Sequence, residues 1–267
     1  MGSDVDGLNY AFLVRWFHMV STEKTVLEPS PVVSIPIVFS PRRLRLVLIV
    51  LVVTLSALGL AAEIAYALFD RRDPWGLFEF ASLSWEENLP TWVASSLLLV
   101  CAGLLWAIGR RAQELGGPRS RHWFAMSAIF TYVSLDETAQ LHENLGYLLS
   151  TGKGILYYDW VIPATGILLV LGMIFGTFLF QLPIHTRSRF ILAAVLYVGG
   201  ALFMELPLGY WVSEHGSSNL GYGLIDWIEE TLELTGVAVF LYALTLELFT
   251  PFGLSITMEQ GKAIHTG

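Results

Sequence analysis

The chain has 267 residues, of which 54% are hydrophobic and 14% are charged, and its mean hydropathy is +0.60. A soluble globular domain carries about 25% charged residues, so this composition argues against a soluble domain and predicts a membrane protein. The formal net charge of -8, with no basic patch between aromatic residues, argues against nucleic-acid binding. The single cysteine, Cys101, lies in an apolar segment and excludes an internal disulfide.

Residues 1–42 precede the apolar part of the chain. They begin with acids rather than with the basic residues of a signal peptide, and their apolar stretch YAFLVRWF is short and contains Arg15. Prolines at positions 29, 31, 36 and 41 disfavour a long helix. We expect a cytoplasmic N-terminal segment, in which NYAFLVRWFHMV forms either an interfacial amphipathic helix or a disordered tail.

Apolar runs of about 20 residues, the length that crosses a bilayer as a helix, occur six times. Asn88 and Pro90 stand where a cap and a first-turn proline would begin the second span. We predict an all-α integral membrane bundle of about six transmembrane helices over residues 43–250, followed by a short cytoplasmic tail over residues 251–267. The predicted spans are Leu44–Phe69, Thr91–Gly109, Arg121–Leu149, Trp160–Leu182, Arg189–Val212 and Leu224–Phe249.

Basic residues lie mostly at one end of this arrangement. Cytoplasmic loops are enriched in Arg and Lys, so both termini are expected in the cytoplasm, and in a bacterium the membrane would be the plasma (inner) membrane. The sequence DRRDPW, after the first span, is the exception. A Gly172-to-Gly176 GxxxG motif is weak support for a homo-oligomer. The basic residues at the cytoplasmic end are Arg42, Arg43, Arg45, Arg110, Arg111, Arg119, Arg121, Arg187, Arg189 and Lys262.

Acidic residues gather at the opposite ends of the spans, which this topology places on the extracytoplasmic side. Ionisable residues at bilayer depth are costly, and they favour a functional role. Glu63 and Glu87 are the weakest candidates, because a carboxylate near the interface can reach water. Five tryptophans near the same boundary are typical of an aromatic belt: Trp85, Trp92, Trp160, Trp211 and Trp227.

The segment SLDETAQLHENL, residues 134–145, follows the apolar run WFAMSAIFTYV with no turn residue between them. A helix that continues to Leu149 would place Asp136 and Glu143 within about 20° of arc on one polar stripe, with Gln140 between them on that face and Glu137 and His142 on either side. The alternative is a helix that ends near Ser134 and an extramembrane turn. About a dozen residues up to Leu135 are too few to cross, which favours the continuous helix.

The segment DWIEETLE opens the sixth span and places Asp226, Glu229, Glu230 and Glu233 within about 100° of arc. Such acids repel one another unless a bound cation, protons or bulk water compensates. The plainer interpretation is a hydrated first helical turn, where acids are favoured.

Glu205 lies two residues before Pro207 in the fifth span. Pro207 removes one backbone hydrogen bond and displaces the carbonyl of Phe203. The bent helix either lines a cavity with Glu205 or lets this carboxylate reach water.

Carboxylates and a histidine from several helices are the ligand set of a di-iron, di-manganese or zinc site. We first predict a metal-dependent membrane enzyme acting on a lipid-like or apolar substrate, with Glu137 or Glu229 as general base. The expected ligands of a divalent iron, manganese or zinc ion are Asp136, His142, Glu143, Glu205, Glu230 and Glu233. The sequences WEEN (85–88) and LDE (135–137) resemble short segments of alkaline ceramidases, but that family's paired histidines in the last span are absent here, so no membership is inferred.

Two alternatives stay open. A cation- or proton-coupled transporter would relay its ion through Glu205, Asp136 and Glu230, and would need polar residues continuing toward the cytoplasm. The sequence offers few of these and no inverted repeat; they are Ser95, Ser96, Ser127 and Thr131. A non-catalytic subunit of a larger membrane complex would use the acidic face to hold a basic partner or a structural ion.

Overall fold

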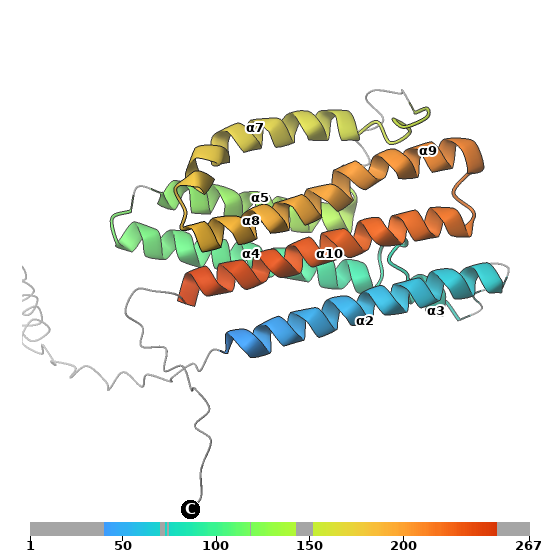
Figure 1. The fold of residues 1–267 in the computed structure, drawn as a ribbon, viewed down its shortest axis with the longest axis horizontal. Coiled ribbons are helices and arrows are strands. Elements are labelled where there is room, and N and C mark those ends of the chain that lie inside the picture. The colour runs from blue at the N-terminus through green and yellow to red at the C-terminus, as the bar shows by residue number, and fades with distance from the viewer. Residues whose placement is uncertain (1–39, 70–72, 74, 118, 143–151, 250–267) are drawn as a thin grey trace, which may run out of the picture. The chain divides into compact units, whose positions relative to one another are not determined.

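The computed structural model describes residues 40–69, 73, 75–117, 119–142 and 152–249, all within one unit, Phe39–Gly267. The expectations for the N-terminal segment before residue 40, for Glu143 and for the C-terminal tail lie outside these residues. The described residues contain helices and no β-strand. The helices are α2 (Pro41–Leu68), α3 (Leu77–Ala81), α4 (Leu89–Glu114), α5 (Ser120–Ala139), α7 (Val161–Phe180), α8 (Ile184–Val198), the π-helix η1 (Gly199–Met204), α9 (Glu205–His215) and α10 (Leu220–Phe249) (Figure 1).

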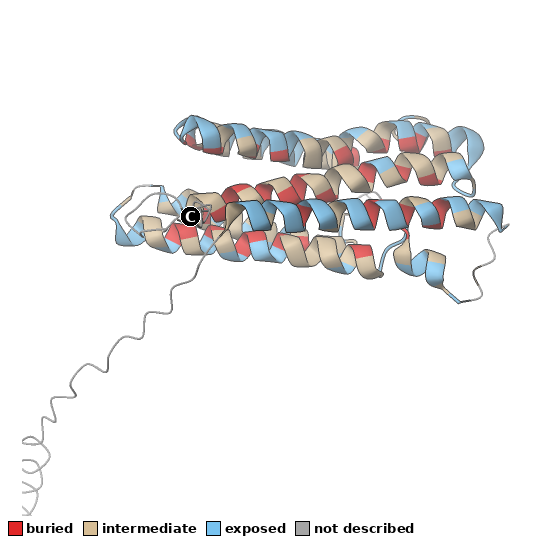
Figure 2. Ribbon diagram, turned by 60° about the horizontal axis from the view of Figure 1, so that its bottom comes forward, coloured by how far each residue is buried: buried red, intermediate tan, exposed pale blue. Residues whose placement is uncertain are grey.

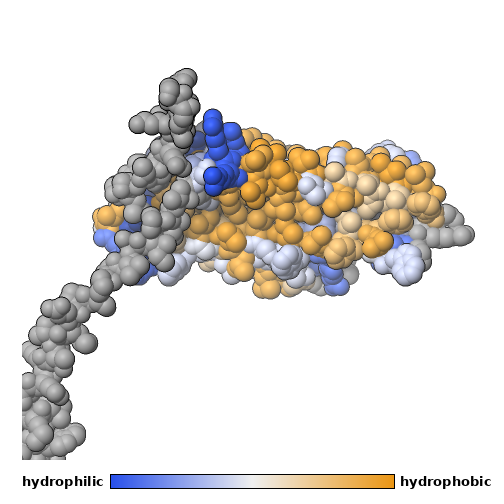
Figure 3. All heavy atoms as spheres, turned by 90° about the horizontal axis from the view of Figure 1, so that it is seen from below, coloured by the Kyte–Doolittle hydropathy of each residue, from blue (hydrophilic) through white to orange (hydrophobic). Residues whose placement is uncertain are grey.

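Five of the described helical segments are long and apolar enough to cross a membrane: α2, α4, α7, the continuous run Ile184–His215 and α10. The remaining predicted span, α5, has 20 residues that include Arg121, Asp136 and Glu137, and it is less apolar. Hydrophobic residues cover much of the visible surface of the helices in Figure 3. Leu46 and Val53 of α2, for example, are 62% and 60% exposed. Such a surface requires lipid rather than water around it. The all-α membrane bundle is thus confirmed, whereas the orientation of its termini stays a prediction.

The helices begin where the sequence provides caps. The Ser40 side chain accepts a hydrogen bond from the backbone N–H of Arg43 at 3.4 Å, and Pro41 opens α2. Asn88 accepts one from the backbone N–H of Thr91 at 3.2 Å before α4. Both arrangements satisfy N–H groups that have no partner within the helix. The predicted cap at Asn88 is therefore confirmed.

Helix α10 is the central helix of the bundle and contacts α2, α4, α8, η1 and α9. Half of the residues in the most apolar part of α10 are buried, against 11% in that of α7, the helix drawn at the top of Figure 1. Trp227 of α10 donates to the Ser56 carbonyl of α2 at 2.8 Å, and Thr186 of α8 donates to Glu247 of α10 at 2.8 Å. Buried faces turn toward neighbouring helices (Figure 2).

One half of the bundle is packed with apolar side chains, and we call it the apolar half. Leu98, Cys101, Leu105 and Leu244 are at most 1% exposed there. Aromatic rings pack edge to face, with ring centroids of Trp123 and Phe178 4.9 Å apart. The buried residues of the apolar half are Leu48, Leu98, Cys101, Leu105, Ile108, Trp123, Phe178, Leu182, Phe190, Ala193, Val237, Ala238, Phe240, Leu241, Ala243 and Leu244.

Helix α5 ends at Ala139, so the predicted continuous helix through the SLDETAQLHENL segment is wrong. Gln140 adopts a left-handed conformation (φ 52°), and its N–H donates to the Asp136 carbonyl at 2.7 Å. The Asp136 carboxylate then accepts the backbone N–H of His142 at 2.9 Å. An aspartate that bonds the backbone in this way competes with helix continuation. The polar stripe expected from Asp136 onward along one helix therefore ends with α5 at Ala139.

The fifth predicted span bends through the π-helix η1 rather than through a simple proline kink. Residues Gly199–Met204 have the wider π turn directly before Glu205 and Pro207. A π segment inserts an extra residue into a helix and occurs frequently at functional sites. It rotates the following helix, α9, and Glu205 on that helix is buried.

Candidate functional site

The other half of the bundle is hollow. A cavity of about 1120 Å³ is lined by the loop before α4, the end of α5, residues 152–160, α8, η1, α9 and the first half of α10. None of the described lining residues is a lysine or an arginine. We call this space the acidic cavity, after its acidic lining residues Glu86, Glu87, Asp136, Glu137, Asp159, Glu205, Asp226, Glu229, Glu230 and Glu233.

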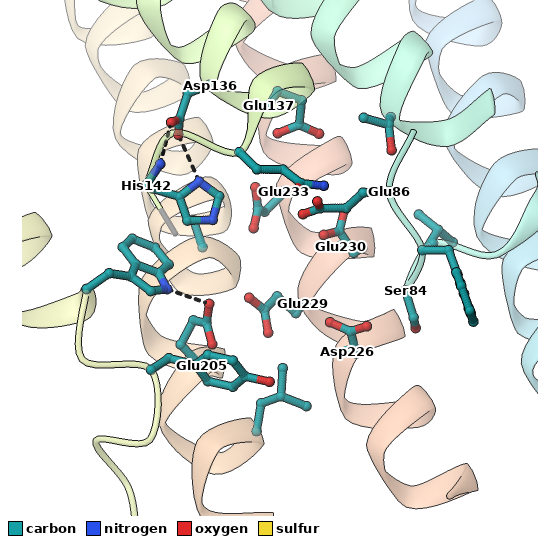
Figure 4. A pocket seen from close by; sticks show the side chains of 18 of the residues that line it. Ser84, Glu86, Asp136, Glu137, His142, Glu205, Asp226, Glu229, Glu230 and Glu233 are labelled. Carbon is teal, nitrogen blue, oxygen red and sulfur yellow. Dashed lines mark hydrogen bonds and ion pairs between the residues drawn. The ribbon is translucent and has the colours of Figure 1, made fainter. Parts of the chain in front are cut away.

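Helix α10 supplies one wall of the acidic cavity. As the helical spacing predicts, Asp226, Glu229, Glu230 and Glu233 all line it, and Figure 4 shows their carboxylates facing the same space. Because α10 begins at Leu220, all four lie beyond its first turn. The plainer interpretation, acids in a hydrated first turn, therefore does not account for them.

Glu229 is the acidic residue of this wall with a buried, unpaired oxygen atom. Its residue is 6% exposed, and its Oε2 atom is buried without a hydrogen-bond partner. A buried polar atom left without a partner costs about 1–3 kcal/mol, and more when it is charged. Such a group in a folded protein needs an explanation, and a bound ligand is one of the few available.

Two glycines let other elements approach α10 at the acidic cavity. A Cβ atom at Gly200 of η1 would lie 2.6 Å from the Glu229 carbonyl oxygen and 2.7 Å from Glu233 Cγ. A Cβ atom at Gly223 would lie 2.1 Å from Glu63 Oε2. At Gly200 only a residue without a side chain fits, because the nearest atom belongs to the backbone, whereas at Gly223 an added Cβ would displace the Glu63 carboxylate. The backbone packing therefore fixes the positions of these carboxylates.

Glu63 is buried, although the sequence indicated an interfacial carboxylate reaching for water. The residue is 8% exposed, and it accepts a hydrogen bond from the Ser82 hydroxyl. It lies between α2 and α10 and does not line the acidic cavity. Its partner residue, in the loop after α3, is distant in sequence, and for this reason the pattern of α2 alone did not reveal it.

Asp136 and His142 form a pair at the end of α5. The Nδ1 atom of His142 lies 3.0 Å from Asp136 Oδ2, and the ring lies against Trp160 with a centroid distance of 4.7 Å. An ionised carboxylate only accepts hydrogen bonds, so Nδ1 of the imidazole is the donor. The turn at Gln140 thus lets His142 bond the Asp136 carboxylate through both its backbone N–H and its ring, which a continuous helix would not allow.

Glu205 is bonded from across the acidic cavity. The Trp160 indole N–H donates to Glu205 Oε1 at 3.1 Å (Figure 4). Three of the tryptophans predicted to form an aromatic belt, Trp160, Trp211 and Trp227, donate to protein oxygens, and the belt itself stays a prediction. Trp92, by contrast, is 67% exposed. Indole N–H groups that need a partner are the reason for this inward orientation.

The predicted metal ligands lie around the acidic cavity but do not converge on one point. Among the described residues, no group of three His, Cys, Asp or Glu side chains is placed to hold a metal ion. Asp136 is engaged with His142, and Glu143 lies outside the described residues. Glu137 and Glu229, the predicted general bases, line the cavity together with Glu205, Glu230 and Glu233. The metal site therefore stays a prediction.

The sequence interpretation missed the segment before α7. Asp159 is buried, and it lines the acidic cavity together with Tyr157 and Tyr158. Burial raises the pKa of the Tyr158 hydroxyl, so this group stays neutral and can donate a hydrogen bond into the cavity. The polar sequence YYDW directly before an apolar span was the available signal.

The floor of the acidic cavity is closed by apolar side chains. A void of only about 10 Å³ continues below Glu137, Glu230 and Glu233, and Leu98, Leu234 and Val237 line its far side. Beside it, polar groups of α4 and α5 bond each other: the Ser95 hydroxyl donates to the Ser134 carbonyl at 2.7 Å, and Ser127 to that of Ala102 at 2.8 Å. These bonds join the two helices, and the serines are not among the described lining residues of the cavity or of the void.

Comparison with curated proteins and with solved structures gave no match. A family profile described as "Domain of unknown function (DUF8692)" matches residues 42–248. This match covers more than half of the chain and contains all of the described acidic cavity. The chain therefore belongs to the DUF8692 family.

Proposed function

We propose that this multi-pass membrane protein binds a cationic ligand in the acidic cavity. One observation carries the proposal: ten acidic residues line the cavity, and no lysine or arginine is among its described lining residues. Electrostatic complementarity then selects a positively charged ligand, and walls of one charge sign attract it at a distance.

The buried Glu229 Oε2 atom gives this proposal an energetic basis. A ligand ammonium or metal cation would supply the missing partner, and a hydrogen bond to a charged group contributes about 1.5–3 kcal/mol. The stability that the unliganded protein forgoes at Glu229 would return as binding free energy.

A coupled transporter has less support. Leu98, Leu234 and Val237 close the floor of the acidic cavity, and the serines beside it bond α4 to α5. The described residues on the far side of the void are therefore apolar, and the void itself measures only about 10 Å³. A role as a non-catalytic subunit has no observation in its favour among the described residues.

A titration of the purified protein in detergent tests cation binding. We expect at least one metal or ammonium cation to raise the thermal unfolding temperature and to bind less tightly in Glu229→Gln. Glu114→Gln is the matched control, because Glu114 is exposed at the other end of the bundle. Binding should weaken with added salt. If neither metal nor ammonium cations bind, the proposal is wrong.

The Asp136–His142 pair favours a second candidate, the metal-dependent enzyme acting on a lipid-like or apolar substrate. A carboxylate bonded to one imidazole nitrogen is the usual way to orient a histidine that binds a metal or moves a proton. In that case Asp136 would act through His142 rather than bind the metal itself.

Metal analysis tests this second candidate. We expect purified protein to carry a stoichiometric iron, manganese or zinc ion that is lost in His142→Ala and reduced in Asp136→Asn. A protein free of transition metal after purification and after incubation with these ions would exclude this candidate.

A further inference from the structure

We propose that the ligand of the acidic cavity is a linear organic polycation, a flexible amine with two or more ammonium groups, rather than a single metal ion. This inference rests on the proposed cation-binding function and names its ligand class. Size, charge spacing, the aromatic lining and the buried Glu229 oxygen carry it.

The acidic cavity is far larger than a single ion. At about 1120 Å³ it reaches the upper end of small-molecule sites, which measure about 300–1,000 Å³. A water molecule occupies about 30 Å³ in the liquid, so a lone cation would leave most of this space to solvent. A polyatomic ligand fills such a volume.

The carboxylates are distributed rather than convergent. Asp226 and Glu233 lie seven residues apart on α10, which at about 1.5 Å per residue spreads the acids of this wall over about 10 Å. Asp136 and Glu137 stand on the opposing α5 side, with Glu86 in the loop before α4. Calcium and zinc need several oxygen or nitrogen ligands within about 2.0–2.6 Å of one point. No such group of three exists among the described residues, whereas successive ammonium groups of an extended amine match a row of separated carboxylates.

Aromatic side chains complete the chemistry of an ammonium site. Six of them line the acidic cavity between the carboxylates: Trp85, Tyr157, Tyr158, Trp160, Tyr197 and Tyr222. Aromatic faces attract ammonium groups and pack against the methylene segments that separate them. Hydroxyl groups such as that of Tyr158 add neutral hydrogen-bonding partners.

Glu229 provides an observation independent of the acid count. Its side chain is more than nine-tenths buried, its Oε2 atom has no hydrogen-bond partner, and Figure 4 shows it facing the cavity beside Asp226 and Glu205. Because the Oε2 atom is fully buried, an ammonium group reaches it only when the neighbouring side chains shift, and its three N–H donors can then also bond an adjacent carboxylate.

A competition between amines and metals tests the inference. The detergent-purified full chain is titrated by calorimetry with spermidine, with butylamine as a monoamine of similar chain chemistry, and with Zn²⁺, Mn²⁺ and Ca²⁺. We expect spermidine to bind at least about tenfold more tightly than butylamine, because each further charge-assisted contact is worth about a factor of ten. We also expect the metal ions to bind more weakly than spermidine.

Amino-acid substitutions test whether spermidine binds in the acidic cavity. Glu229→Gln and Glu233→Gln should each weaken spermidine binding about tenfold or more, whereas Glu114→Gln leaves it unchanged. Thermal unfolding of each variant shows that it is folded. Trp85→Leu tests the aromatic contribution, since Trp85 is 42% exposed and its replacement need not disturb packing.

The outcomes separate this inference from the proposed function. If a metal ion binds and spermidine does not, the organic-polycation inference is wrong and cation binding stands. If spermidine binds no better than butylamine, or if Glu114→Gln weakens it as much as Glu229→Gln, the inference is also wrong. If no cation binds at all, both proposals fail.

Discussion

The two halves of the bundle use the same helices for opposite purposes. Helix α10 shows this within one element: Asp226, Glu229, Glu230 and Glu233 line the acidic cavity, and from Val237 onward α10 contributes buried residues of the apolar half. The apolar half is close-packed, whereas the acidic half encloses about 1120 Å³. The difference indicates that the apolar half supplies the stability that the acidic half gives up, as is usual where a site needs unfavourable local chemistry.

The largest expected effect comes from placing a polar group in the apolar half. Leu105→Gln buries an amide at a fully buried position with no partner, at a cost of about 3–5 kcal/mol. The matched change, Leu208→Gln, places the same amide at the wall of the acidic cavity, where water and carboxylates can bond it. The yield of monodisperse protein and its unfolding temperature are measured for both variants. If Leu105→Gln and Leu208→Gln lost the same amount of stability, the division into an apolar and an acidic half would be wrong.

A smaller effect is expected from adding a methyl group at the close helix contacts. A Cβ atom at Gly236 would lie 2.6 Å from the Tyr197 backbone nitrogen, so Gly236→Ala should cost about 1–3 kcal/mol through overpacking. Gly200→Ala should cost a similar amount and also weaken cation binding, because it displaces Glu229 and Glu233.

Gly172→Ala is the control for both glycine variants, since a Cβ atom there meets nothing within 4 Å. It should leave stability and binding unchanged. Thermal unfolding and the spermidine titration report the two properties separately. If Gly236→Ala weakened binding more than Gly200→Ala, the two halves would not be independent.

Removing an acid from the acidic half should stabilise the protein. Glu229→Met replaces a buried carboxylate whose Oε2 atom has no partner, and we expect about 1–3 kcal/mol of added stability without ligand. Glu205→Met is the matched control, because that carboxylate accepts the Trp160 hydrogen bond and its loss should be destabilising. Without ligand, the unfolding temperature should therefore rise in Glu229→Met and fall in Glu205→Met. A destabilised Glu229→Met would mean that the carboxylate is satisfied within the protein.

The contrast also separates what the sequence could predict from what it could not. Runs of apolar residues are a local signal, so five spans, the cap at Asn88 and the acidic face of α10 followed from sequence. The end of α5 did not, because Asp136, Glu137 and Thr138 look like a continuing helix until the Asp136 carboxylate bonds the backbone beyond it. That competition depends on a few hydrogen bonds and leaves no apolar pattern.

Contacts between distant segments were likewise invisible in the sequence. The burial of Glu63 depends on Ser82 and on the missing side chain at Gly223, and the bond between Trp160 and Glu205 joins the segment before α7 to α9. Periodicity reports which face of a helix is polar and not what faces it. Without that information, convergence of the acids on a metal looked plausible, whereas the structure shows the described acids spread around a large space.

The smallest expected effect tests the pair at the end of α5. Asp136→Asn keeps an oxygen for the His142 backbone N–H and loses the charged acceptor for the ring, so it should cost about 1 kcal/mol or less, given that both side chains are partly exposed. A double-mutant cycle with His142→Ala isolates the ring interaction, and we expect a coupling of about 0.5–1 kcal/mol in the free energy of unfolding. A coupling of zero would show that the turn at Gln140, and not the charge, holds His142. Spermidine affinity should change less in Asp136→Asn than in Glu229→Gln, because the Asp136 carboxylate already has a partner in the protein while the Glu229 oxygen has none.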